Sequence, residues 1–135
     1  MTVEAAVEDD LVAIMNVFDG ADLAVSAADV DHAIEADWAL VARSGRGTVI
    51  GALMASPEAT AVRIGAVAVR PDRRGQGIGS ALLEAAATRW QPLVAGFDPS
   101  LAQFYRSNGF AVTVEERGHG RRPGVAARVA QGDRD

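Results

Sequence analysis

The first third of the chain changes from a helical to a strand-like pattern of apolar positions. Between residues 8 and 18 apolar side chains recur at i, i+3, i+4 and i+7, which predicts an amphipathic helix over Glu8–Phe18. A short strand, Thr2–Ala6, is expected before it. Ser26 followed three positions later by Asp29 resembles a capping box, so a second helix should open there and run to about Ala36.

From residue 38 the period shortens to that of strands. Three β runs are expected, separated by turns such as Ser44-Gly45-Arg46-Gly47, and they should form an antiparallel meander. Helices and strands alternate afterwards, which indicates an α/β (α+β) domain with a mixed sheet, antiparallel first and then joined by a crossover helix. The predicted strands are Trp38–Arg43, Thr48–Ser56, Ala61–Val69, Leu93–Phe97, Phe110–Glu116 and Gly124–Ala130, and the later helices are Gly77–Arg89 and Pro99–Asn108.

The amino-acid composition excludes several classes of catalytic chemistry. The 135 residues are 49% hydrophobic, which fits one domain, and no apolar run or leader pattern indicates a membrane, so a cytoplasmic protein is expected. The absence of Cys excludes a thiolate nucleophile, and the absence of Lys excludes Schiff-base and P-loop chemistry. Since the two imidazoles, His32 and His119, are far apart in sequence, a His-rich metal site is not expected, while sites made of carboxylates alone stay possible.

Charge is distributed unevenly along the chain. Residues 1–58 carry 11 acidic side chains and two arginines, whereas residues 59–135 carry seven acids and 11 arginines. This asymmetry hints at an anionic ligand in the second half, while two solvated faces remain the simpler interpretation. Arg121-Arg122 is too short a basic patch to indicate nucleic-acid binding.

The most informative segment is the glycine-rich turn between a strand that ends at Val69 and the helix that follows. Three glycines alternate with other residues from Gly75 to Gly79, so the backbone can approach a diphosphate at the amino end of a helix, where free N–H groups and the helix dipole attract anions. Arg73 and Arg74 add positive charge. The spacing does not fit the dinucleotide pattern G-x-G-x-x-G in either register.

Two motifs together are similar to those of the GNAT N-acetyltransferase superfamily. The turn Arg74-Gly75-Gln76-Gly77-Ile78-Gly79 matches [QR]-x-x-G-x-[GA], the acyl-CoA pyrophosphate loop of that family. The segment Leu101–Phe110 resembles the family's later helix, which ends in an aromatic pair and closes with Gly-Phe.

This resemblance implies a GNAT fold over residues 1–116, with six or seven strands and about four helices, and with a last strand and frayed tail over 117–135. It also implies an N-acetyltransferase that uses acetyl-CoA and a primary amine, from a small molecule or a protein, as partners, without a metal. Because the chain has no Cys, the acetyl group is expected to pass directly to the amine in a ternary complex. The residues expected to bind the cofactor are Val67, Val69, Arg74, Gly75, Gln76, Gly77, Ile78, Gly79 and Ser80, and Tyr105 is the expected general acid.

The sequence departs from the family pattern at two places. Asp98 stands where many members have Asn, and together with Pro99 it reads as the start of a helix. The strand Ala61–Val69 contains no acid that could serve as general base, so the base is left open between a carboxylate, His119 and a chain of water.

Several alternatives stay open. Glu35 and Asp37 could border the acceptor groove or be solvated, and Tyr105 could be a core residue. A non-catalytic acyl-CoA-binding or sensing module is the alternative function. Whether the protein forms a homodimer is also open.

Overall fold

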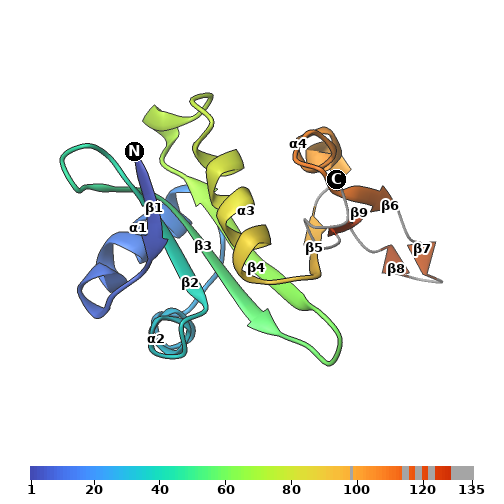
Figure 1. Ribbon diagram of the computed structural model, residues 1–135, viewed down its shortest axis with the longest axis horizontal. Coiled ribbons are helices and arrows are strands. Elements are labelled where there is room, and N and C mark those ends of the chain that lie inside the picture. Colours follow the sequence, from blue (N-terminus) through green and yellow to red (C-terminus); the bar gives the residue numbers. More distant parts are fainter. Residues whose placement is uncertain (98, 114–115, 118–119, 122–123, 129–135) are drawn as a thin grey trace.

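The computed structural model describes residues 1–97, 99–113, 116–117, 120–121 and 124–128 (Figure 1). Within these ranges the strands are β1 (Thr2–Ala5), β2 (Ala39–Arg43), β3 (Val49–Pro57), β4 (Val62–Val69), β5 (Leu93–Phe97), β6 (Ala111–Thr113), β7 (Glu116–Arg117), β8 (Gly120–Arg121) and β9 (Gly124–Arg128). The helices are α1 (Leu11–Gly20), α2 (Ala27–Glu35), α3 (Ile78–Arg89) and α4 (Ala102–Ser107), with 3₁₀ turns η1 (Glu8–Asp10), η2 (Pro71–Arg73) and η3 (Pro99–Leu101).

Seven strands form one sheet in the order β1-β2-β3-β4-β5-β9-β6, and β7 and β8 pair separately. Strands β4 and β5 run parallel, and the other neighbours in the sheet run antiparallel. The connection between β4 and β5 is α3, because parallel neighbours need a crossover. The predicted fold class, a mixed and mostly antiparallel sheet flanked by helices, is confirmed.

The predicted elements differ from the observed ones mainly at their ends. The predicted helix Glu8–Phe18 divides into η1 and α1, and the predicted helix Pro99–Asn108 divides into η3 and α4. The predicted strand Phe110–Glu116 is shorter in the structure, since β6 ends at Thr113 and Glu116 pairs with Arg121 instead. A strand predicted at Gly124–Ala130 corresponds to β9, which lies between β5 and β6, a position that the order of elements along the chain does not reveal.

The sheet buries an apolar layer on each of its faces. One layer lies between the sheet and helices α1 and α2, where Ile14, Phe18 and Val30 are buried. The other lies beneath α3, where Leu82 and Leu83 are buried. Strands β2 and β3 are covered on both faces, which explains their continuous apolar sequence.

The serine half of the capping box that the sequence predicts at the start of α2 is confirmed. The Ser26 hydroxyl oxygen accepts a hydrogen bond of 3.0 Å from the Asp29 N–H. This bond satisfies one of the free donors at the helix start and is worth about 1 kcal/mol.

Helix α3 lies unusually close to β3 because Gly51 has no side chain. A Cβ at Gly51 would lie 3.0 Å from Ile78 Cγ2 and 3.2 Å from Leu82 Cδ1. The first two turns of α3 therefore rest directly on the strand, which fixes the position of the helix start.

Strand β4 pairs with β3 along its whole length but with β5 over only its first part. Opposite β3, Gly65 is an extra residue between the pairs Ala55–Ile64 and Met54–Ala66. Such a bulge bends its strand. The parallel pairing of β4 with β5 covers Val62–Ile64, so β4 and β5 part where the bulge occurs.

A buried ion pair ties the start of α1 to the sheet. The Arg43 guanidinium donates two hydrogen bonds to the Asp10 carboxylate, of 3.0 and 2.8 Å, and a third to Glu4 on β1. The Val7 N–H donates to Asp10 as well. Burial alone would raise the pKa of Asp10, but these hydrogen bonds and the Arg43 charge outweigh it and lower the pKa below its usual value.

Replacing Asp10 with Asn should lower the free energy of unfolding by about 1–3 kcal/mol at neutral pH, because the bidentate pair is lost. Since the folded-state pKa of Asp10 is lowered, its contribution is complete above about pH 4 and disappears as the pH falls through that lowered pKa. Thermal denaturation across the acid range should therefore show a gap between wild type and Asp10→Asn that closes at low pH. The exposed neighbour Asp9 provides the control: a loss in Asp9→Asn as large as in Asp10→Asn would contradict this account.

Candidate active site

The turn between β4 and α3 has the backbone conformation that only glycine adopts easily. After η2, Gly75 and Gly77 have φ of +79° and +83°, and a Cβ at either position would meet open space. Any other residue there would strain the backbone by about 1–2 kcal/mol. The two glycines are therefore required by the shape of the turn, and the space beside them is free to receive a ligand.

Helix α3 begins at this turn with its amide groups facing outward. Gly77 is the N-cap residue, and the first helical hydrogen bond runs from the Ala81 N–H to the Gly77 carbonyl. The amides of residues 78–80 thus precede the hydrogen-bonding ladder, and the positive end of the helix dipole lies there. The position is suited to a negatively charged group.

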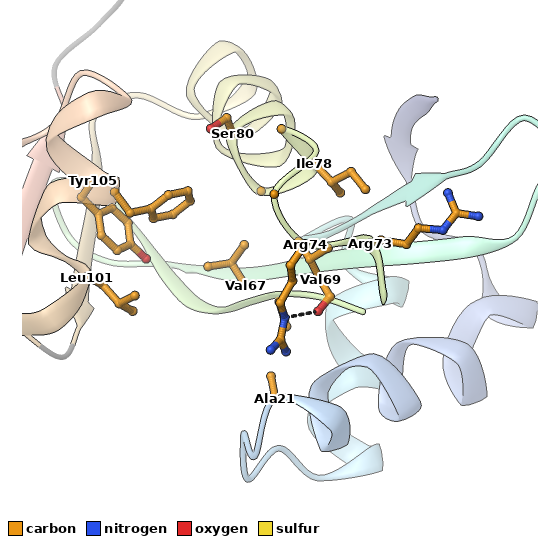
Figure 2. A pocket seen from close by; sticks show the side chains of 14 residues that line it. Ala21, Val67, Val69, Arg73, Arg74, Ile78, Ser80, Leu101 and Tyr105 are labelled. Carbon is orange, nitrogen blue, oxygen red and sulfur yellow. Dashed lines mark hydrogen bonds between the residues drawn. The ribbon is translucent and has the colours of Figure 1, made fainter. Parts of the chain in front are cut away.

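The Arg74 side chain is held beside β4 by a hydrogen bond to the backbone of the last residue of that strand. Its Nε donates a hydrogen bond of 3.1 Å to the Val69 carbonyl oxygen, which leaves the terminal nitrogens directed elsewhere (Figure 2). Among the described residues, neither Arg74 nor Arg73 forms an ion pair. Their charge is therefore available to a ligand at the helix start.

The end of β4 offers backbone groups on the side away from β3. The Arg70 N–H donates a hydrogen bond to the Ile50 carbonyl oxygen, so these two residues are a hydrogen-bonded pair. Along an antiparallel ladder, hydrogen-bonded pairs alternate with non-bonded pairs. Val69 and Val67, opposite Gly51 and Leu53, are consequently the non-bonded positions whose N–H and C=O groups point away from β3. Because the pairing with β5 ends at Ile64, these groups face the gap between the parted strands.

Tyr105 reaches the same gap from α4 on the other side. Its ring is buried, makes edge-to-face contacts with Phe104 and Phe110 at centroid distances of 5.3 Å, and directs its hydroxyl toward Val67 (Figure 2). Burial raises the pKa of Tyr105 to about 12, since a phenolate would lose its hydration there. The phenol is thus a neutral hydrogen-bond donor throughout the physiological range.

One cavity of about 540 Å³ joins these features. It runs from the turn before α3, past β4, to α4. Every residue that the family resemblance assigns to the cofactor lines this cavity except Gln76, and so does Tyr105. The lining residues are Ala21, Val67, Ala68, Val69, Arg73, Arg74, Gly75, Gly77, Ile78, Gly79, Ser80, Leu101, Phe104 and Tyr105.

Some lining residues were not among the predicted ones. Phe104 belongs to the aromatic pair of the later motif and could have been found there, whereas Ala21 reaches the cavity through the packing of α1 and carries no local signal. The cavity suits a ligand with an anionic end near Arg73 and Arg74 and a mostly apolar arm. Leu101 forms part of the apolar end and is 45% exposed.

Other candidates from the sequence lie elsewhere. Glu35 and Asp37 are exposed at the end of α2 and do not line the cavity. His32 is exposed on α2. Asp98 and His119 lie outside the described residues.

The amino-acid sequence matches the model of one protein family. The acetyltransferase (GNAT) domain matches residues 35–112, more than half of the chain. The chain belongs to the GNAT acetyltransferase family. The matched segment of this GNAT domain includes β4, the glycine turn, α3 and α4, which carry most of the cavity lining.

Solved structures share the fold over nearly the whole GNAT domain. They include a GNAT-family acetyltransferase from Bacillus cereus ATCC 10987 (TM-score 0.80, 18% identity, 96% of each chain covered) and Ard1 from Thermoplasma volcanium (TM-score 0.78, 18% identity, 96% of this chain and 97% of that chain). A third is a GNAT superfamily phosphinothricin acetyltransferase from Sinorhizobium meliloti in complex with AcCoA (TM-score 0.70, 24% identity, 93% of this chain and 85% of that chain). No curated protein sequence matches the chain.

Within the part of the chain that the structure describes, the helices are all too short or too polar to pass through a bilayer. In the same part of the chain, His, Asp and Glu side chains do not gather in groups of three that could hold a metal ion.

The burial of Tyr105 can be measured directly, because it is the only tyrosine in the chain. An ultraviolet titration of phenolate absorbance should give a midpoint near 12 in the folded protein, compared with about 10 in urea. Since burial raises the folded pKa by penalising the phenolate, Tyr105 leaves stability unchanged below about pH 10 and lowers it as the pH rises from there through 12. Tyr105→Phe should lack this alkaline loss, and a folded-state midpoint near 10 would show that the hydroxyl is solvated.

Proposed function

We propose that this GNAT domain transfers an acetyl group from acetyl-CoA to a primary amine, directly and within a ternary complex. The observation that carries the proposal is the cavity, which combines an anion-binding helix start, a free strand edge and a phenol. The Sinorhizobium meliloti neighbour, which has the same fold, is in complex with AcCoA, and this supports acetyl-CoA as the donor.

In the proposed complex the diphosphate of the cofactor lies at the start of α3. The amides of residues 78–80 donate to its oxygens, and the left-handed Gly75 and Gly77 keep Cβ atoms out of its way. Arg74 adds a charge-assisted hydrogen bond from its terminal nitrogens, while its Nε stays on Val69. Gln76 lies on the same turn outside the cavity lining, so its contribution would come from the turn's backbone.

The pantetheine arm then follows the end of β4. Its amides are extended and polar, so they can pair with the C=O group of Val67 and with the Val69 N–H in the way that a neighbouring strand would, which leaves the Val67 N–H for the thioester. The Val69 carbonyl already accepts a hydrogen bond from Arg74. The arm would thus replace the pairing that β4 loses when β5 diverges.

The transfer step follows from this placement. The amine nitrogen attacks the thioester carbonyl carbon, the Val67 N–H polarises the carbonyl oxygen, and the carbon–sulfur bond breaks with its electron pair going to sulfur. The amine loses its proton to water, because Arg63 is the only ionisable side chain on β4. CoA leaves as a thiolate next to Tyr105.

The raised pKa of Tyr105 defines its part in this step. Full transfer of a proton from a phenol of pKa about 12 to a thiolate of pKa about 8.5 is uphill by roughly 5 kcal/mol. Tyr105 therefore stabilises the departing sulfur mainly by donating a hydrogen bond, and water completes the protonation.

A panel of amines incubated with acetyl-CoA and followed by mass spectrometry tests the function. Acetylated amine together with an equal amount of free CoA supports the transferase. Tight acetyl-CoA binding without turnover across the panel would instead support the alternative, a non-catalytic acyl-CoA-binding or sensing module, which the lack of an acid on β4 favours.

Arg74→Ala should weaken acetyl-CoA binding about 5- to 50-fold through the lost charge-assisted contact, and the loss should shrink at high salt. Isothermal titration calorimetry at low and high salt measures both effects. The matched control is Arg70→Ala, since Arg70 is exposed at the end of the same strand but does not line the cavity. Equal losses in the two variants would mean that only the net charge matters.

Tyr105→Phe keeps the buried ring and removes the hydroxyl. If the hydroxyl stabilises the leaving sulfur, turnover should fall about 10- to 100-fold while the affinity for acetyl-CoA and the melting temperature stay nearly unchanged. Steady-state kinetics, calorimetry and thermal melting separate these quantities. Unchanged turnover under conditions where chemistry limits the rate would assign Tyr105 to the core alone.

A further inference from the structure

The first turn of α3 and the aromatic ring of Phe104 fit together across the cavity. A Cβ placed on Gly79 would lie 3.3 Å from Phe104 Cζ, which is tighter than nine in ten real Cβ contacts, and at an ordinary contact distance of 3.5 Å from Cε1. Unlike Gly75 and Gly77, Gly79 does not have a left-handed backbone. The missing side chain at Gly79 therefore makes room for the ring.

This contact connects two parts of the molecule whose strands β4 and β5 share only a short parallel pairing. Helix α3 rests on β3 through Gly51, whereas α4 packs with β6 and β9 beyond β5. The sheet joins the two parts through the pairing of Val62–Ile64 with Leu93–Ala95. Beyond that pairing β4 and β5 are no longer hydrogen-bonded to each other. The start of α3 and α4 lie on the two sides of this region (Figure 1), and Gly79 and Phe104 bring them together.

Phe104 also contacts the residue expected to meet the sulfur. Its ring lies edge-on to the Tyr105 ring, with centroids 5.3 Å apart and an interplanar angle of 75°. The Phe104 carbonyl oxygen accepts hydrogen bonds from the Ser107 hydroxyl and the Asn108 side-chain amide, of 2.9 and 2.8 Å. Because Phe104 and Tyr105 are neighbours in α4 and their rings are in edge-to-face contact, a displacement of the Phe104 ring should also displace the Tyr105 ring.

We propose that Phe104 is a positioning residue: seated in the space that Gly79 leaves, it sets the separation between the start of α3 and the Tyr105 hydroxyl. The inference rests on the proposed function, in which the helix start binds the diphosphate and Tyr105 meets the sulfur of the same cofactor. The width of the opening then decides whether one acetyl-CoA molecule can satisfy both ends. Phe104 itself acts through Tyr105.

The proposal predicts that two damaging substitutions compensate for each other. Gly79→Ala pushes the ring outward by a few tenths of an ångström, and Phe104→Leu withdraws the ring, so each should lower turnover about 3- to 10-fold. The double variant Gly79→Ala/Phe104→Leu adds a methyl group where it removes ring atoms, so it nearly conserves volume. Its turnover should return to within about 2-fold of wild type, far above the product of the two single losses.

Turnover should be measured well below the melting temperature of each variant, so that unfolding does not contribute to the measured loss. Gly20→Ala is the matched control for the glycine change: Gly20 is also helical, and a Cβ there would lie an ordinary 3.9 Å from its nearest neighbour, Pro71 Cδ. Trp90→Leu is the control for ring loss, since Trp90 packs on Trp38 rather than on Tyr105. Both controls should keep wild-type turnover.

A second measurement needs no cofactor. In the ultraviolet titration of the sole tyrosine, each single variant should expose Tyr105 to water and lower its midpoint from about 12, and the double variant should restore it. Additive losses in turnover, or additive midpoint shifts, would overturn the positioning role. If wild type transfers no acetyl group at all, the proposed function fails, and the titration alone then decides whether Phe104 and Gly79 position Tyr105.

Discussion

The separation of β4 from β5 is the constraint on which the site depends. Backbone N–H and C=O groups that lose their partner must find another, since burying them unpaired costs free energy. The bulge at Gly65 turns the end of β4 away from β5 just beyond Ile64, and the backbone of Val67 and Val69 is left facing a cavity. A ligand with amides of its own can supply the missing pairing.

Glycine has two distinct uses in this chain, and only one is conformational. Gly75 and Gly77 are needed because the turn before α3 has positive φ, and they leave open space beside the helix start. Gly51 and Gly79 are needed because something packs against them, α3 in one case and the Phe104 ring in the other. The first pair shapes the ligand site, and the second pair fixes where α3 lies relative to the sheet and to α4.

The charged side chains show the same division between residues that support the fold and residues that line the cavity. The acidic first half uses Asp10 and Glu4 to hold Arg43, which stabilises the junction of β1, β2 and the start of α1. In the second half Arg73 and Arg74 line the cavity. The charge asymmetry of the sequence therefore has more than one source. It includes the exposed acids of α2 and, as a local feature, the two arginines at the start of α3.

The sequence by itself determined the elements, the fold class and the glycine-rich turn before α3. These features are local: helical and strand periods reflect which face is buried, and the alternation of glycines between Gly75 and Gly79 is a property of a few adjacent residues. Of the two family motifs, the first lies in this short segment and the second is the equally local segment Leu101–Phe110. These predictions, and the capping of α2 by Ser26, needed no knowledge of distant contacts.

The tertiary structure alone decided the place of β9 between β5 and β6, the pairing of Arg43 with Asp10, and the meeting of Gly79 with Phe104. Each of these joins residues far apart in the chain, and a side chain's sequence neighbours do not say which distant group it will contact. The last glycine of the turn shows the difference most clearly. The sequence groups Gly79 with its two neighbours as part of one loop, whereas packing against α4 gives it a separate role, because a missing Cβ matters only in relation to what fills its space.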